Sequence, residues 1–138
     1  MKVTGVLGFV VISISALKLV AGNPLGRTQS TAVIGRIFCN GNWTETPADV
    51  ILWDRDLTDK DDKMGETKTA SHGSFYVQGH EKEFTAIDPE IRIHHTCPDV
   101  PSCIKVEVPA DYITAGSLPT KIFDAGTIEL TKPGVSVC

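Results

Sequence analysis

The strongest constraint on the fold is an alternation of apolar and polar side chains with a period of two, in short segments separated by turn-forming residues. From Ile104 to Val108, for example, the branched aliphatic residues fall on one side of an extended chain and the two charged residues on the other. No window of a dozen residues combines apolar side chains at i, i+3, i+4 and i+7 with a capping residue ahead of it. The pattern therefore predicts a sheet protein without long helices.

About eight short strands follow from this alternation, with a turn signal every ten or so residues. The expected strands are 31–39, 50–53, 63–70, 74–79, 90–96, 104–108, 121–123 and 127–130. The segment 63–70 is polar and rich in threonine, which suits the edge of a sheet. Strands of this number and spacing predict an all-β fold, an antiparallel β-sandwich of two sheets with little or no helix.

The first 22 residues are typical of a secretory signal peptide. An apolar run without acidic residues extends from Val3 to Leu17, and Val20-Ala21-Gly22 offers the small residues accepted at a cleavage site. The run is short for a membrane span and Lys18 interrupts it, so we expect cleavage after Gly22 and no transmembrane anchor. The secreted, extracellular chain then consists of a polar lead, residues 23–30, and one domain, residues 31–138.

The charge balance argues against one class of partner. The formal charge is −4 at pH 7, and it becomes −6 once Lys2 and Lys18 leave with the signal peptide. Binding to nucleic acid depends on lysines and arginines that neutralise phosphates, so an acidic domain of this kind is not expected to bind it. The sequence also offers no cofactor motif, and we expect no cofactor.

Four cysteines lie in the mature chain and are expected to form two disulfides, because secreted proteins meet oxidising conditions. They are Cys39, Cys97, Cys103 and Cys138. Three connectivities are possible. We favour Cys97 with Cys103, which are close in sequence, and Cys39 with Cys138, which would hold the tail. A metal site is the competing interpretation, but the chain has neither a C-x-x-C pair nor H-x-x-x-H spacing.

Five aspartates crowd one predicted loop and are candidates for binding a hard cation. They are Asp54, Asp56, Asp59, Asp61 and Asp62. An EF-hand is excluded, because a loop starting at Asp54 has Asp59 where glycine is required and Gly65 where glutamate is required. Three neighbouring basic residues, Arg55, Lys60 and Lys63, neutralise much of the charge, so we favour a solvated hairpin tip over an ion site.

The histidines do not form a metal-binding pair. His94 and His95 are adjacent in an expected strand, so their side chains point to opposite faces and cannot bind one ion together. His95 shares a face with Ile91 and Ile93, which predicts a buried imidazole that is hydrogen-bonded to backbone or to a neighbouring strand. A hydrolase would instead require His95 to converge with Arg92 or Arg36 in an open cleft.

No nucleophile is favoured either. His72 lies in a turn and His80 at a strand end, and both are expected to be solvated. Ser71, beside His72, is predicted to lie in a turn. Cysteines held in disulfides are inert as nucleophiles. We therefore expect no catalytic residues and no enzymatic activity.

A glycosylation sequon, Asn42-Trp43-Thr44, falls in a predicted surface turn. In a secreted protein this pattern predicts an N-linked glycan on Asn42. Trp43 either packs over the end of the sheet or makes an exposed contact, whereas Trp53, inside a strand, is expected in the core.

Several motifs together resemble the nematode transthyretin-like family of small secreted proteins. In order along the chain they are Cys39-Asn40-Gly41, Gly73-Ser74-Phe75, Phe84-Thr85-Ala86-Ile87-Asp88-Pro89, Ile93-His94-His95-Thr96-Cys97, Pro109 with Tyr112-Ile113-Thr114, and Asp124-Ala125-Gly126-Thr127-Ile128. They lie within residues 31–130, nearly the whole mature chain. The resemblance implies a transthyretin-like sandwich of two four-stranded sheets, a secreted role and a nematode source, but no single biochemical activity.

The chain departs from what the resemblance implies at two places. Family members often carry a nearly unbroken acidic run in the second loop, which basic residues interrupt here. Transthyretins proper have a short helix after the fifth strand, but Pro98, Pro101 and two cysteines occupy that segment, so we expect a disulfide-closed loop instead.

The related hydroxyisourate hydrolases depend on an early-strand histidine and a C-terminal Tyr-Arg-Gly-Ser, and neither end of this chain matches.

The function predicted from these observations is that of a non-enzymatic extracellular binding protein. Its loops or a sheet face would contact a cell surface, a lipid head group or a host protein, since sandwiches commonly present recognition from their end loops. The binding residues are not predicted. The alternatives are a carrier of small ligands, which would need an apolar channel at an oligomer interface, and a hydrolase related to the hydroxyisourate hydrolases.

Overall fold

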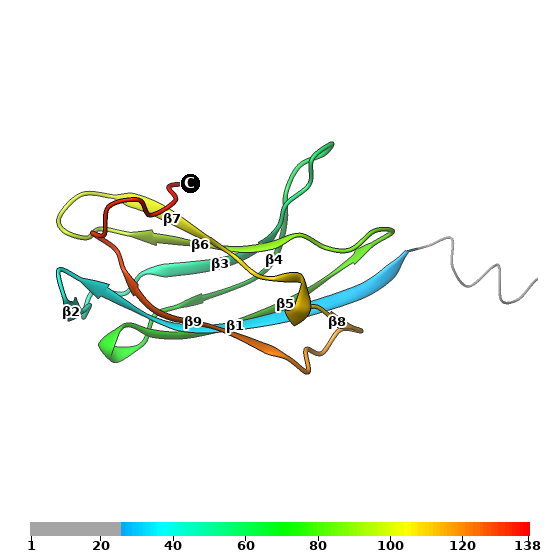
Figure 1. Cartoon of the computed structure of the whole chain (residues 1–138), viewed down its shortest axis with the longest axis horizontal. Coiled ribbons are helices and arrows are strands. Elements are labelled where there is room, and N and C mark those ends of the chain that lie inside the picture. Colours follow the sequence, from blue (N-terminus) through cyan, green and yellow to red (C-terminus); the bar gives the residue numbers. More distant parts are fainter. Residues whose placement is uncertain (1–25) are drawn as a thin grey trace, which may run out of the picture.

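The computed structural model describes residues 26–138, which form two packed β-sheets (Figure 1). The predicted signal peptide, residues 1–22, and the first part of the lead lie outside the described residues. The elements are β1 Arg27–Cys39, β2 Asn42–Trp43, β3 Asp49–Asp54, β4 Asp62–Lys68, the 3-10 turn η1 Ser71–Gly73, β5 Ser74–Glu83, β6 Pro89–His95, β7 Ser102–Glu107, the 3-10 turn η2 Ala110–Tyr112, β8 Thr114–Ala115 and β9 Ile122–Glu129. The predicted all-β sandwich is confirmed.

One sheet is built around β1 and the other has the order β4-β3-β6-β7. β1 pairs with β2, β5 and β8 in antiparallel fashion and with β9 in parallel fashion, so five strands share this sheet where four were expected. β4 lies at an edge of the second sheet, as its polar sequence predicts. Within residues 26–138, no helix is long and apolar enough to cross a membrane.

The first strand begins at Arg27, four residues before the predicted start of the domain. Gln29, Ser30 and Thr31 are buried although they are polar. This part of the strand therefore shows no alternation of apolar and polar side chains. Gln29 is satisfied by distant backbone: its amide donates to the carbonyl of Thr85 at 2.8 Å and accepts from the N–H of Ile87 at 3.0 Å. Buried polar groups of this kind are tolerated because they are hydrogen-bonded.

The core fills the space between the sheets with the inward-facing side chains of alternating positions. Members from both sheets include Val33, Ile37, Phe75, Val77, Val50, Leu52, Ile91, Ile93 and Ile104, each at most 6% exposed. Because burying such a side chain contributes about 1.5–3 kcal/mol, the inner faces carry most of the driving force for folding.

Trp53 is not a core residue, contrary to the prediction. It follows the buried Leu52 in β3, so its side chain lies on the outer face of the sheet. There the guanidinium of Arg92 stacks over its ring at 5.0 Å from the centroid. This large aromatic residue therefore packs against Arg92 on the outer face instead of filling the interior.

The predicted presence of two disulfides is confirmed, but the favoured pairing is wrong. Cys39 pairs with Cys97 and Cys103 pairs with Cys138, with Cα atoms 5.9 and 5.4 Å apart. Cys97 follows β6 and lies opposite the end of β1, whereas Cys103 lies in β7 beside the returning tail. The segment between β6 and β7 contains no helix, as expected, but it is not closed by a disulfide of its own.

Candidate functional site

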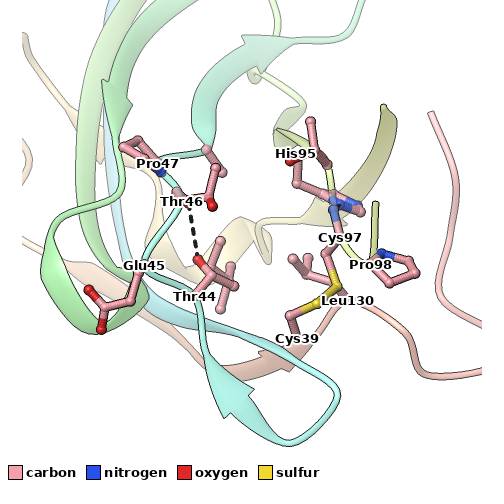
Figure 2. A pocket seen from close by; sticks show the side chains of 12 residues that line it. Cys39, Thr44, Glu45, Thr46, Pro47, His95, Cys97, Pro98 and Leu130 are labelled. Carbon is pink, nitrogen blue, oxygen red and sulfur yellow. Dashed lines mark hydrogen bonds between the residues drawn. A yellow bond between two sulfur atoms is a disulfide. The ribbon is translucent and has the colours of Figure 1, made fainter. Parts of the chain in front are cut away.

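A pocket of about 180 Å³ opens at the end of the sandwich where β1 and β6 finish (Figure 2). Its lining comes from the end of β1, the loop between β2 and β3, the end of β6 with the segment that follows, and the residue after β9. The lining residues are Ile37, Cys39, Thr44, Glu45, Thr46, Pro47, Ala48, His95, Thr96, Cys97, Pro98 and Leu130. The pocket thus joins both sheets and two end loops.

The Cys39–Cys97 disulfide and a buried leucine form an apolar part of the pocket wall. Figure 2 shows the sulfur–sulfur bond beside Leu130, which is 7% exposed. The opposite rim is polar: the hydroxyl of Thr44 donates to the carbonyl of Thr46 at 3.2 Å, and Glu45 is exposed. An apolar wall with a few polar groups at the rim is the usual composition of a binding site.

His95 lines the pocket and is 7% exposed. Its Nδ1 accepts a hydrogen bond from the N–H of Cys97 at 3.0 Å, so the neutral ring carries its proton on Nε2. That Nε2 is buried and has no hydrogen-bond partner among residues 26–138. Burial lowers the pKa of His95 below its ordinary value of 6.5, and the neighbouring charge of His94 lowers it further. The ring is therefore a neutral donor with Nδ1 already occupied.

The three residues that a hydrolase would need do not converge. His95 faces the core, whereas Arg92, three residues earlier in β6, lies on the outer face beside Trp53. Arg36 is exposed on the other sheet, with its guanidinium 5.3 Å from the ring centroid of Trp43. The pocket consequently offers an apolar surface and hydrogen bonds, and these residues do not place a base next to a nucleophile in it.

The aspartates that were candidates for a cation site are divided by the structure. Asp54 and Asp62 lie near Glu83 of β5, with one carboxylate oxygen from each residue within 4.8 Å of the others. Asp61 instead contacts Arg92 at 2.6 Å, and this guanidinium lowers the pKa of Asp61. Glu83 was not anticipated, because it lies far from the loop in sequence. Calcium takes six to eight oxygen ligands, so these three carboxylates would be a partial set.

The remaining two aspartates make local contacts. The carboxylate of Asp56 accepts from the N–H of Thr58 at 3.2 Å, and that of Asp59 accepts from the N–H of Lys60 at 2.8 Å. These bonds order the tip of the β3–β4 hairpin and orient the two carboxylates toward their own loop. The tip of the loop at Asp59 is therefore solvated. Asp54, the last residue of β3 before the loop, is buried and 3% exposed.

Replacing Asp54 by asparagine is expected to stabilise the protein at pH 7. Burial raises the pKa of Asp54 above its ordinary value of 3.8, although the N–H of Asp88 donates to Oδ1 at 2.8 Å. A raised folded-state pKa means that stability falls as the pH rises from 3.8 through the folded-state value, so the ionised side chain carries a penalty at neutral pH. Asparagine keeps the acceptor oxygen and removes the charge.

The measurement is urea unfolding of both proteins at pH 7 and at pH 3. We expect a higher midpoint for Asp54→Asn at pH 7 and no advantage at pH 3, where the carboxyl is protonated in both states. Asp59→Asn is the matched control, because Asp59 is exposed and should change neither midpoint. A lower midpoint for Asp54→Asn at pH 7 would contradict a destabilising charge.

The sequon residue Asn42 is exposed in β2, next to the turn at Asn40 and Gly41. Trp43 combines the two roles considered for it: it is 45% exposed, and its ring makes edge contacts with Phe38 and His72, at centroid distances of 5.9 and 5.0 Å. An exposed turn is open to a glycosyltransferase, which is the physical requirement for a modified sequon.

We expect protein secreted from eukaryotic cells to carry a glycan on Asn42. Asn42→Gln should abolish a glycosidase-sensitive increase in mass, and Thr44→Ser should retain it because serine also completes the sequon. Intact mass measurement before and after glycosidase treatment checks this prediction. An unchanged mass in the secreted wild-type protein would refute it.

Comparisons with known proteins agree with the motifs. A family model described as the transthyretin-like family matches residues 34–109. Transthyretin-like protein 5 of Caenorhabditis elegans is 40% identical over 111 residues, which cover 77% of this chain and 79% of that protein. Transthyretin-like protein 2 of the same organism is 40% identical over 116 residues, covering 77% and 78%. Among solved structures, a 9R-lipoxygenase from Cyanothece aligns at 21% identity and a TM-score of 0.46 over 76% of this chain and 18% of that one.

Proposed function

Because the chain belongs to the transthyretin-like family, we propose that it is a secreted, non-enzymatic binding protein whose disulfide-lined pocket takes one protruding group of an extracellular partner. The partner lies on a cell surface, and its protruding group is a protein side chain or a lipid head group. Two sheets hold the pocket from both sides, and the loops at its rim are free to meet a large surface.

The size of the pocket is the observation that carries this proposal. Sites that enclose a drug-sized ligand measure about 300–1,000 Å³. A pocket of about 180 Å³ is smaller, so it accommodates a side chain or a head group whose remainder stays outside.

The buried imidazole at the pocket supplies a reason for selectivity. A buried donor without a partner costs about 1–3 kcal/mol, and this cost is recovered if a ligand provides an acceptor. The N–H of His95 is such a donor, and His95 lines the pocket. Partners with an exposed carbonyl, hydroxyl or similar acceptor are therefore favoured.

Secretion is the second part of the proposal and is supported by the cysteines. The described residues hold two disulfides and no free cysteine, a pattern that persists in oxidising compartments. The apolar leader before Gly22 is consistent with export. Expression of the full chain in eukaryotic cells should release protein that begins at Asn23, and retention inside the cell would contradict this part.

Retention of the full disulfide-bonded protein on intact cells and on vesicles of neutral or anionic phospholipid tests the binding function. We expect retention of the wild type and about ten-fold less for Thr46→Trp, in which a large side chain obstructs the rim. Ser117→Trp is the matched control, since Ser117 is also exposed and follows β8, which lies at the other end of the sandwich from β2 (Figure 1). Failure of the wild type to bind any surface would overturn the function, and equal retention of Thr46→Trp would overturn the role of the pocket.

A further inference from the structure

The C-terminal tail lies beside the free edge of β7 and pairs with it at one isolated bridge (Figure 1). The N–H of Lys105 donates to the carbonyl of Ser136 at 2.9 Å, and the N–H of Cys138 donates to the carbonyl of Cys103 at 3.1 Å. Between these bonds, Ile104 and Val137 form an antiparallel bridge. The Cys103–Cys138 disulfide closes this arrangement, so one covalent bond and two hydrogen bonds hold the end of the tail on the sheet.

The two disulfides differ in what they hold and in how they are covered. Cys39–Cys97 joins the two sheets, lines the pocket, and Cys97 packs against the hydrophobic core. In the other disulfide Cys138 is exposed, while Cys103 is half-buried in β7. An attacking thiolate must reach a sulfur atom. Cys138 is exposed, whereas the other three cysteines are half-buried.

An imidazole stands beside the sulfur that would leave. His94 pairs with Cys103 across β6 and β7, and its Nε2 lies 3.9 Å from the Sγ of Cys103. A protonated imidazole beside a cysteine stabilises the thiolate and can transfer a proton to it. His94 is exposed to solvent.

The other charged groups around His94 come from each element packed against it. Asp49 faces it from β3 and is itself paired with Lys68 of β4 at 2.5 Å. Lys105 lies two residues beyond Cys103 in β7. These are one acidic and two basic groups, so the surroundings of His94 carry no large net charge.

We propose that Cys103–Cys138 is an exchangeable disulfide through which an external thiol becomes attached to Cys138. The thiolate attacks the Sγ of Cys138 and forms a mixed disulfide, while the bond between Cys103 and Cys138 breaks. The electron pair leaves on the Sγ of Cys103, which takes a proton from the imidazolium of His94. One disulfide is consumed and one is formed, so the exchange needs a thiol and no separate oxidant. The tail, now bearing the thiol, is no longer tied to β7.

The first experiment exposes the full native protein to excess reduced glutathione at pH 7, with acid quenching, alkylation and peptide mass spectrometry. We expect glutathione on Cys138 and alkylation of Cys103 at a rate at least about ten-fold faster than opening of Cys39–Cys97. A cysteine-containing peptide in place of glutathione shows whether a protein thiol can also serve. Equal rates for the two disulfides, or a first adduct on Cys39 or Cys97, would overturn the proposal.

A second measurement follows the tail and the role of His94. Hydrogen exchange at the amide of Lys105 should accelerate when the adduct forms, because its acceptor is on the tail. His94→Gln should slow adduct formation in mildly acidic solution and approach the wild-type rate in alkaline solution, where a neutral imidazole has no proton to transfer. His72→Gln removes another exposed imidazole and should leave the rate unchanged at every pH. A His94→Gln rate equal to that of the wild type throughout would remove His94 from the mechanism.

Discussion

Replacing Gly79 by alanine is expected to lower the free energy of unfolding by about 3 kcal/mol, the upper end of the range for overpacked sites. Gly79 of β5 lies where the two sheets touch, opposite β4. A Cβ atom there would come closer than 3.0 Å to the backbone carbonyl of Met64, and one on Gly65 would meet the carbonyl of Gln78 in the same way. Because the obstacle is backbone and not a flexible side chain, the strands must separate to accept a methyl group.

Urea unfolding at pH 7 measures this effect, and three comparisons isolate its cause. Lys82→Ala changes an exposed residue of the same strand and should cost less than about 0.5 kcal/mol. Gly65→Ala should cost as much as Gly79→Ala, and the double variant should cost less than their sum, since either change already separates the strands. A loss below about 0.5 kcal/mol for Gly79→Ala would show that the sheets are not in close contact there.

Removing the inter-sheet disulfide, by Cys39→Ala together with Cys97→Ala, is expected to cost about 4 kcal/mol. The disulfide closes a loop with a sequence separation of 58. Without it the unfolded chain gains conformational entropy, and the chain-entropy model gives about 4 kcal/mol for a loop of this length. The same change removes a wall of the pocket, so binding to cell surfaces or vesicles should fall with stability. Thermal and urea unfolding, with retention measured well below the midpoint, check both consequences.

The matched comparison removes the other disulfide, by Cys103→Ala together with Cys138→Ala. The sequence separation of Cys103 and Cys138 is 35, and removing this disulfide gives the unfolded chain nearly the same gain in entropy, because that gain depends on the logarithm of loop length. We nevertheless expect a smaller loss, since the tail, left with two backbone hydrogen bonds near its end, also gains freedom in the folded protein. Equal losses for the two pairs would contradict the distinction between a bond that joins the sheets and one that holds a tail.

The alternation of side chains was sufficient to predict most of the strands, the edge position of β4 and the orientation of His95, because each depends on which neighbours along one strand share a face. Two-residue strands such as β8 were missed, since two residues cannot display a period. The pairing of β9 parallel to β1 was also missed. That pairing depends on where the chain returns after a long connection, which local sequence does not record.

The candidate site was the least predictable part. Thr46 and Leu130 carry no sequence signal, yet they meet at the pocket because loops from both sheets end there. Glu83 joins Asp54 from another strand, and Gln29 is buried because loop atoms of Thr85 and Ile87 satisfy it. Each of these contacts joins positions that are far apart in the chain.

Sequence alone was enough for the all-β class, the family resemblance and the presence of two disulfides, because composition, local alternation and motif order are properties of the chain itself. The partners of Cys39 and Cys103, the outward position of Trp53 and the pocket around His95 emerged only when the two sheets were packed together. The reason is geometric: a disulfide or a pocket depends on distances and directions between elements, and a strand specifies only the two faces of its own side chains.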